Sequence, residues 1–216
     1  MLFDFATIPA QDRFKLLAST ILPRPIAWTV TQSRDGRLNA APFSFFNAVA
    51  GDPPVVGIGM GSHEPGRPRD SRCNIRDTGQ FVVNLVSEVM AEAMNITAIE
   101  FESEINEVEQ AGLQMLPSVY VHPPRIAGSP VSLECELIQI VELGPAWGLV
   151  LGRVLAMHVK DDCVVDAGTR NIDTKSLKLI GHMHTHDGTW YARTTDLFQV
   201  KRIPRKEWKE VGTKAE

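Results

Sequence analysis

The chain has 216 residues, of which 44% are hydrophobic and 22% are charged, and its formal net charge is −4. This length favours one domain with a sizeable core over two domains, so we treat residues 1–216 as a single domain. The negative charge argues against nucleic acid or an anionic membrane as the main partner.

Three features of the sequence indicate a cytoplasmic location. No apolar run reaches the length that spans a bilayer, and Asp4 stands where an export signal would carry a cation. The three cysteines, Cys73, Cys135 and Cys163, are far apart and odd in number. They therefore indicate free thiols in a reducing compartment rather than a disulfide framework or a zinc site.

The first part of the chain predicts a hairpin, a strand and a helix. Residues 25–32 are β-rich, an Asp-Gly turn signal lies in "SRDG", and "RLNAAPFSFF" follows, which together predict a β-hairpin. Residues 55–61, "VVGIGMG", predict a third strand. A short helix is expected over residues 71–79, with Asp70 as its cap and Gly79 as its end.

The remaining elements favour an antiparallel sheet. We expect a strand at 80–86, a helix at 87–99, long strands at 131–143 and 147–159, and a hairpin turn at "DDC" that leads into "VVDAG". The acidic segment 100–112 could be a binding face, but a solvated helix or loop is the simpler interpretation. Six or seven strands with few helices predict a mainly β fold, an antiparallel barrel with appended helices.

The glycines of "GIGMG", residues 57–61, do not match a dinucleotide-binding fingerprint, because the spacing differs and no helix follows directly. Alternating glycines on a strand indicate that something approaches the backbone closely. Neighbouring protein is the favoured interpretation, and a ligand is the alternative.

A basic cluster precedes the expected helix. Arg67, Arg69 and Arg72 gather there in an otherwise acidic chain, together with Ser71. Guanidinium groups, a hydroxyl and the free N–H groups of a helix N-terminus together suit a phosphate. The alternative is a solvated loop in which Asp70 is a plain cap.

Three histidines, His182, His184 and His186, occupy alternate positions in "GHMHTHDG". On a strand they would face one way, as metal ligands could. The glycine-rich context suggests a loop, and no accompanying carboxylate or cysteine has ligand spacing. We therefore expect no metal site and interpret these residues as a polar rim of a pocket.

The sequence offers no catalytic side chain of its own. It contains neither a G-x-S-x-G elbow nor an H-E-x-x-H motif. This leaves two alternatives, a bound cofactor that performs the chemistry or a protein without catalysis.

Four motifs taken together resemble the flavin reductase-like FMN-binding split-barrel family, and in particular its flavoredoxin and flavoprotein-oxygenase-type branch. They are "PRPIAWTVT", "GRLNAAPFSFFNAVAGDPPVV", "RDSRCNIRDTGQFVVNLV" and "GTWYART", and they extend from about Leu22 to Ile203. The resemblance implies a six-stranded antiparallel split barrel of Greek-key type, a homodimer, and FMN bound near the dimer interface.

The resemblance also implies a set of cofactor-binding residues. Ser44 and Asn47 would address the polar edge of the flavin, while Phe45 and Phe46 wall the pocket. The phosphate would lie with the remaining residues of the matching loop and helix, which are Arg69, Asp70, Ser71 and Asn74. Thr31 and Arg24 are weaker matches.

The chain departs from the family pattern at one position in this loop. Where the family often has Arg before the Asn, this chain has Cys73, with Arg72 one place earlier. On a helix that shift rotates the side chain by about 100°. We therefore expect weaker phosphate affinity, or Arg67 as a substitute.

The activity implied is hydride transfer from NAD(P)H to the flavin N5, with reduced flavin or electrons passed to a downstream monooxygenase or another acceptor. His182 is a candidate for the open side of the flavin, where a nicotinamide would stack. Two alternatives remain open: an FMN electron carrier or FMN-dependent oxygenase, and a flavin-binding protein without turnover.

The expected homodimer has modest support in the residues themselves. Trp147 and Trp190 stand beside glycines in segments that a monomer could expose, and large aromatic residues are enriched at interfaces. The alternative is that both are ordinary core residues.

Overall fold

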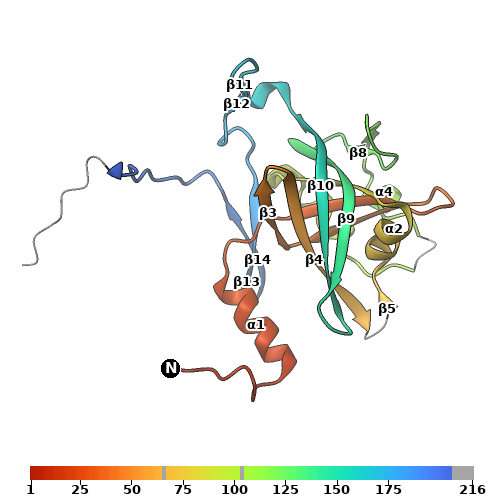
Figure 1. Ribbon diagram of the computed structural model, residues 1–216, viewed down its shortest axis with the longest axis vertical. Helices are drawn as coiled ribbons and strands as arrows, with labels where there is room; N and C mark the ends of the chain where they lie inside the picture. Colours follow the sequence, from red (N-terminus) through yellow and green to blue (C-terminus); the bar gives the residue numbers. More distant parts are fainter. Residues whose placement is uncertain (65–66, 103–104, 206–216) are drawn as a thin grey trace, which may run out of the picture.

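The computed structural model describes residues 1–64, 67–102 and 105–205, and an antiparallel β-sheet dominates it (Figure 1). Its main path runs β2-β1-β6-β9-β10-β4-β3. The bounds of these strands are β1 Ala27–Gln32, β2 Leu38–Phe43, β3 Phe45–Gly51, β4 Pro54–Glu64, β6 Gln80–Asn84, β9 Val131–Glu142 and β10 Trp147–Val159.

The two ends of this path belong to one interrupted strand. Only Ser44 separates β2 from β3, yet β2 pairs with β1 and β3 pairs with β4. The sheet therefore closes on itself, and the seven strands of the path become six when β2 and β3 are counted together. The predicted antiparallel split barrel is confirmed, and so is the predicted β1–β2 hairpin.

Apolar side chains fill the barrel and one outer side of it. Ile58, Met60 and Phe81 are fully buried in the main cluster. A second cluster, around Trp28, joins the barrel to the segment that follows β6. The indole Nε1 of Trp28 donates to Thr97 Oγ1 over 2.9 Å, so this segment is held against the barrel next to the site described below.

Short elements surround the barrel. The helices are α1 Ala10–Thr20, α2 Asp70–Thr78, α3 Ala91–Ile96 and α4 Glu107–Gln110, with 3₁₀ turns at Glu88–Met90 and Asp161–Cys163. The short strands are β5 Arg67–Pro68, β7 Met115–Leu116, β8 Arg125–Ile126, β11 Val164–Asp166, β12 Asn171–Ile172, β13 Ile180–Thr185 and β14 Gly188–Arg193. Helix α1 lies beside the β13–β14 hairpin (Figure 1).

Three local predictions were wrong. Asp70 is the first residue of α2 and not its cap, since the N-cap is Arg69, whose side chain makes no capping bond. The expected end of the helix at Gly79 is confirmed, and this glycine has a φ of 73°. "VVDAG" forms no hairpin with β10, because the Asp161–Cys163 turn leads the chain away and β11 pairs with β12. The expected helix at 87–99 is a 3₁₀ turn followed by the short α3.

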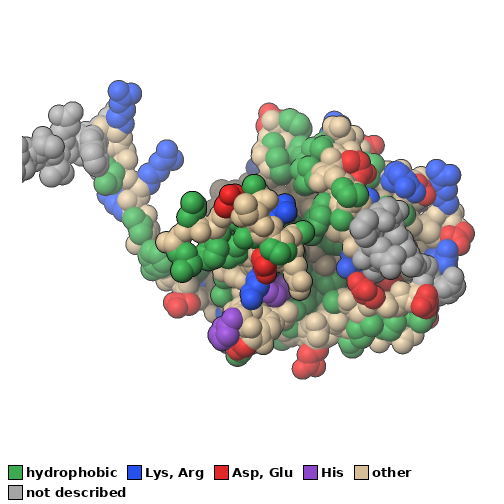
Figure 2. All heavy atoms as spheres, turned by 90° about the horizontal axis from the view of Figure 1, so that it is seen from below, with side chains coloured by type: hydrophobic (Ala, Val, Ile, Leu, Met, Phe, Trp, Pro, Cys, Tyr) green, Lys and Arg blue, Asp and Glu red, His purple; other side chains and the backbone are tan. Residues whose placement is uncertain are grey.

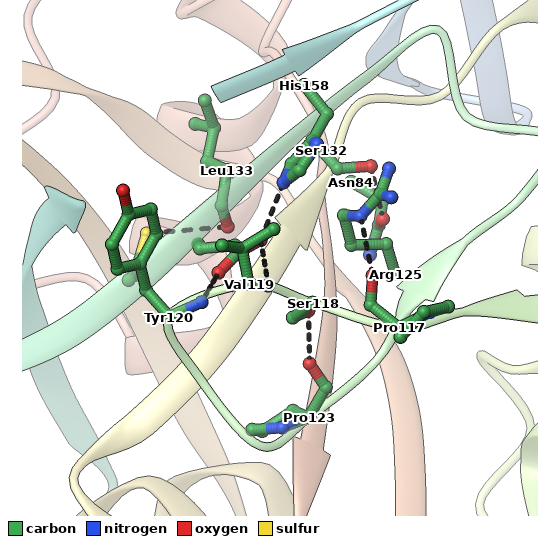
Figure 3. Close-up of polar contacts among 12 residues, drawn as sticks. Asn84, Pro117, Ser118, Val119, Tyr120, Pro123, Arg125, Ser132, Leu133 and His158 are labelled. Carbon is green, nitrogen blue, oxygen red and sulfur yellow. Dashed lines mark hydrogen bonds and ion pairs between the residues drawn. The ribbon is translucent and has the colours of Figure 1, made fainter. Parts of the chain in front are cut away.

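A buried carboxylate on β9 holds the loop that comes after β7 in place (Figure 3). Glu134 is fully buried, and it accepts hydrogen bonds from the backbone N–H groups of Val119, at 2.8 Å, and Tyr120, at 2.6 Å. His158 Nε2 lies 2.6 Å from the same carboxylate. Burial alone would raise the pKa of Glu134, but the two backbone donors and His158 outweigh it and lower the pKa below its ordinary value.

Two further observations concern the expected location and the thiols. Within the part of the chain that the structure describes, no helix has the length and apolar character needed to cross a membrane. All three cysteines are free thiols. Burial raises the pKa of Cys135 to about 12, so this thiol stays protonated and unreactive.

Candidate functional site

A cavity of about 330 Å³ lies where β2 gives way to β3. The first turn of α2 and the segment from Thr97 to Phe101 form one side, and α1 and β10 contribute to the other. Of the nine residues expected to bind a cofactor, Ser44, Phe45, Arg69, Asp70 and Ser71 line this cavity. Its two ends differ in chemistry, one polar and one aromatic.

The polar end is built on the N-terminus of α2. Among the described residues no side-chain capping bond is made to this helix, so its first N–H groups are left for another acceptor. Arg69 lines the cavity, and its Nη2 donates to Glu100 Oε1 over 3.0 Å. Ser71 is only 1% exposed. An uncapped helix terminus beside an arginine and a buried hydroxyl is a site for an anion.

Asn39 on β2 connects the polar side chains behind this end. Its Oδ1 accepts from Ser71 Oγ at 2.6 Å and from Thr31 Oγ1 at 3.3 Å, and its Nδ2 donates to Glu107. Asn74 Nδ2 in turn donates to Thr31 Oγ1 at 3.1 Å. Thr31 and Asn74 therefore support the cavity wall from behind, and Asn74 lines a small adjoining pocket of about 70 Å³.

Acidic residues also lie at the polar end, and among them Glu107 is partly buried. Burial raises the pKa of Glu107, and the nearby negative charge of Asp70 adds to this, while the Asn39 bond opposes it. The interpretation of segment 100–112 as wholly solvated was therefore wrong, because Glu100 and Glu107 both line the cavity. Residues 103–104 lie outside the described part of the chain.

Three aromatic rings form the opposite end. The ring centroid of Phe45 lies 5.8 Å from that of Phe14 and 5.1 Å from that of Trp147. Trp147 was expected at a subunit interface or in the core, but here it lines the cavity. The three rings are tilted relative to one another, by 59° between Phe45 and Trp147, and together they offer an apolar, aromatic surface to a planar ligand.

The glycines of β4 explain how these rings fit. A Cβ at Gly59 would lie 3.0 Å from Phe45 Cβ, and one at Gly61 would lie 3.4 Å from the Trp147 ring. Both glycines also line the cavity. Close packing of neighbouring protein was the favoured interpretation of this motif and is confirmed, and the same glycines keep the cavity open.

Next to them, Ser62 carries a polar group without a partner. Its Oγ is buried, and among the described residues it has no hydrogen-bond partner. Because Ser62 lines the cavity, a ligand is the natural source of that bond.

Two neighbours of Phe45 do not reach the cavity. Phe46 points the other way along β3 and packs against the barrel core, as strand alternation requires. The expectation that both aromatics wall the pocket was therefore wrong for Phe46. Asn47 is exposed, and its Oδ1 accepts from the Ala48 N–H at 2.8 Å, so the structure does not bring it to this site.

Arg24 lies beneath the strand break and not in the cavity. Its guanidinium is buried, and it donates to the carbonyl groups of Ala18 and Ile21. Its Nε lies 3.4 Å from Ser44 Oγ, and its Nη2 lies 3.2 Å from His182 Nδ1. His182 Nδ1 is also 2.7 Å from Ser44 Oγ.

The histidine motif differs from its prediction. His182 and His184 lie on β13, not in a loop; His186 follows in the turn. Burial, the charge of Arg24 and the neighbouring His184 lower the pKa of His182 to about 4, so it is neutral at physiological pH. No group of three or more His, Cys, Asp or Glu residues suited to a metal occurs among the described residues.

Arg72, which stands one place earlier than the arginine of the family pattern, points away from the cavity. Arg72 is buried beneath β10, where a Cβ at Gly148 would collide with its guanidinium, and it forms an ion pair with Glu142 at 3.5 Å. It therefore does not reach the cavity. The side chain of Arg67 lies outside what the structure describes.

Sequence reasoning missed several residues of this cavity. Phe14 and Ser62 lie outside the four quoted motifs, Asn39 lies in one of them but was given no role, and Glu107 stood within an acidic run that is ordinarily solvated. Asn39 alone offered a signal, since an amide flanked by small apolar residues on a predicted strand has to find partners.

Comparison with known proteins agrees with this architecture. The model of the flavin reductase like domain matches residues 18–171. A protein of Deinococcus radiodurans, described as uncharacterized, is 39% identical over 212 residues, covering 96% of this chain and 92% of its own.

Two solved structures are similar over nearly their whole length. Nitrilotriacetate monooxygenase component B from Bacillus cereus has a TM-score of 0.86 and 29% identity, covering 93% of this chain and 98% of its own. The 2-nitrobenzoate 2-nitroreductase NbaA of Pseudomonas fluorescens has a TM-score of 0.87 and 28% identity, covering 98% and 100%. By its fold and its matched residues, this chain belongs to the flavin reductase-like domain family.

Proposed function

We propose that the protein binds FMN in the 330 Å³ cavity and acts as an NAD(P)H-dependent flavin reductase. The observation that carries the proposal is the pairing, within one cavity, of an uncapped helix N-terminus beside Arg69 and a wall of aromatic rings. A phosphate suits the first and a flat ring system suits the second.

The residues present fit this cofactor. The cavity volume falls in the range of about 300–1,000 Å³ that small-molecule sites occupy. Ser62 has a buried hydroxyl that finds no partner in the described part of the chain, and Gly59 and Gly61 leave the backbone open beside it. Arg69, Ser71 and the first N–H groups of α2 would hold the phosphate, with Asn39 and Thr31 orienting Ser71 from behind.

When bound, FMN supplies the acceptor and donor of a hydride. The protein's own share is binding, orientation and exclusion of water. Phe45, Trp147 and Phe14 would cover the apolar part of the ring, and Ser44, fixed by His182 and Arg24, would present its oxygen at the polar edge.

A second candidate function is reduction of an organic substrate by the bound flavin. The 28% identity to a protein named as a 2-nitrobenzoate 2-nitroreductase favours it. A carrier that passes electrons to a monooxygenase is supported in the same way by the monooxygenase component B. We further propose a cytoplasmic homodimer, and exposed apolar side chains such as Phe198 support the second subunit.

Titration of the apoprotein with FMN and with riboflavin tests the cofactor assignment. FMN should bind more tightly, because only FMN carries the phosphate that the polar end of the cavity suits. Arg69→Ala and Ser71→Ala should each weaken FMN by about 1–3 kcal/mol, the worth of a charge-assisted hydrogen bond. Arg76→Ala, on the exposed last turn of the same helix, is the matched control and should change nothing.

Bleaching of the bound flavin by NADH or NADPH without air tests the activity. A yellow protein that NADH and NADPH leave oxidised, but that a reduced donor protein bleaches, would contradict the flavin reductase assignment and favour an electron carrier. A bleached flavin that an organic nitro compound re-oxidises without air would favour the second candidate. Equal affinity for FMN and riboflavin would remove the phosphate assignment.

A further inference from the structure

A second cavity, of about 220 Å³, lies against the first one. The two cavities share Pro42, Ser44 and Ala98 as a common wall. The far side of the second cavity comes from α3 and from the β13–β14 hairpin, which supplies His182, Thr189 and Tyr191. Ser44 therefore faces both the proposed cofactor site and this neighbouring space.

The lining of the second cavity carries no formal charge. None of the residues that line it is Lys, Arg, Asp or Glu. Ile26 and Met94 supply apolar surface, and the Tyr191 ring lies with its centroid 5.8 Å from that of His182. His182 itself is neutral at physiological pH, since its pKa is lowered to about 4. No lining residue therefore supplies a counter-charge to an ionic ligand, and the nearby Arg24 already donates to the carbonyl groups of Ala18 and Ile21. An uncharged planar ligand would find both apolar and aromatic contacts.

One polar atom beside this cavity has no partner. His182 Nδ1 lies 3.2 Å from the guanidinium of Arg24, which can only donate, so Nδ1 is the acceptor. In the neutral ring the proton is therefore on Nε2. That Nε2 is buried, and among the described residues it has no hydrogen-bond partner. A buried N–H group without an acceptor is costly, and a ligand oxygen would remove the cost.

We propose that this second cavity binds a small, uncharged, planar molecule whose ring carries a hydrogen-bond-accepting oxygen, which accepts from His182 Nε2–H. A cavity of about 150 Å³ holds benzene, so 220 Å³ suits one substituted ring. Ring ketones, quinones and uncharged nitroarenes share this chemistry. The inference rests on the proposed function, because the shared wall at Ser44 would place such a molecule beside the flavin.

Ligand-observed NMR on the FMN-loaded protein tests the proposal with two probes of nearly equal shape. Acetophenone has a carbonyl oxygen, and ethylbenzene has no acceptor. We expect acetophenone to bind about five- to tenfold more tightly, the worth of one hydrogen bond to a buried donor. Benzoate, which is anionic, should bind more weakly than acetophenone because the lining offers no counter-charge.

Variants locate the binding. His182→Phe keeps a ring but removes the donor, so the affinity for acetophenone should fall to that for ethylbenzene. Thr189→Trp fills the second cavity and should weaken both probes, while the flavin spectrum stays unchanged because Thr189 does not line the first cavity. His184→Phe, two residues along the same strand and outside both cavities, is the matched control and should affect neither probe.

The remaining outcomes would overturn the proposal. Equal affinity of the wild type for the two probes would remove the hydrogen bond from His182. Probe binding that survives Thr189→Trp would place the ligand elsewhere. Binding seen only after removal of FMN would make the second cavity part of the flavin site. A protein that never binds FMN would instead contradict the proposed function, and its spectrum reports that separately.

Discussion

Ser44 interrupts the strand that closes the barrel, and its Oγ lies 2.7 Å from His182 Nδ1 and 3.4 Å from Arg24 Nε. The same residue lines both cavities. A serine at this position can end one ladder and begin another while its hydroxyl stays available at the polar edge of a ligand. The position that closes the sheet is thus also a position that builds the site.

Glu107 provides a residue-scale test of the phosphate assignment. Its carboxylate lies at the polar end, so it should repel a bound phosphate, and Glu107→Gln should bind FMN about three- to tenfold more tightly at pH 8, where about 1 kcal/mol of repulsion is removed. Because its pKa is raised, Glu107 takes up a proton at a higher pH than an ordinary glutamate. The advantage of the variant should therefore shrink as the pH falls through that raised pKa.

Fluorescence titration of FMN across pH, for both proteins, measures this ratio of affinities. Comparing the ratio at each pH cancels the titration of the FMN phosphate itself. Riboflavin should show no such difference, and Glu109→Gln, on the exposed side of α4, is the matched control. A Glu107→Gln variant that binds FMN more weakly would mean that the carboxylate accepts hydrogen bonds from the ligand instead.

At the scale of elements, the glycines of β10 allow other elements to approach the barrel wall. A Cβ at Gly152 would overlap the ring of Phe81, which is fully buried in the core. Gly152→Ala should therefore lower the free energy of unfolding by about 1–3 kcal/mol, the usual cost of overpacking. Urea denaturation measures it. Gly51→Ala is the control, because nothing lies within 4 Å of its added Cβ; equal effects of the two changes would contradict this account.

The buried Glu134 joins a loop to β9 through hydrogen bonds with Val119, Tyr120 and His158, the three partners labelled in Figure 3. Glu134→Gln should cost about 3 kcal/mol in unfolding free energy at pH 7, since the donors around it then face a neutral amide. The folded pKa of Glu134 is lowered from 4.5. Its contribution is therefore present above 4.5 and is lost as the pH falls through the folded pKa.

Thermal or urea unfolding of both proteins between pH 7 and pH 3 measures this dependence. The wild type should lose more stability on acidification than the variant does, so the two curves converge at low pH. Glu136→Gln, an exposed neighbour on the same strand, should follow the wild type throughout. A constant gap between wild type and Glu134→Gln at all pH values would show that the charge plays no part.

At the scale of the whole molecule, apolar side chains lie exposed near the C-terminal end of the described chain. Figure 2 shows the described part of the segment after β14, residues 194–205, standing away from the body, with hydrophobic side chains at its base. Phe198 is 91% exposed, Val200 78% and Trp190 54%. Apolar side chains exposed on this scale are typical of an interface. A second copy of this chain is the partner that the family resemblance implies.

If the second subunit completes the flavin site, diluting the protein to monomer should release FMN, because association and ligand binding would then be thermodynamically linked. Light scattering and flavin fluorescence over one dilution series measure both events. Phe198→Asp should shift both transitions to higher protein concentration by the same factor, whereas Asp196→Asn, two residues earlier in the same segment, should shift neither. A monomer that keeps its FMN would contradict the shared site.

The parts of this protein that the sequence alone determined are local ones. The β1–β2 hairpin follows from alternation around an Asp-Gly turn, and the end of α2 follows from Gly79, whose left-handed φ a glycine adopts without strain. Arg69, Asp70 and Ser71 could be assigned together because one helix turn holds them. In a hairpin or a single helix turn, residues that are close in sequence are also close in space, so the sequence pattern is enough to predict which of them lie together.

The tertiary structure decided everything that depends on side-chain direction or on distant segments. Phe46 and Asn47 match the family motif as well as Phe45 does, but strand alternation turns Phe46 into the core, and Asn47 ends on the exposed part of β3. Phe14, Ser62 and Glu107 lie far apart along the chain and meet only because the barrel closes at Ser44. No local sequence pattern predicts that closure, because it depends on hydrogen-bonded pairing between strands that are far apart along the chain.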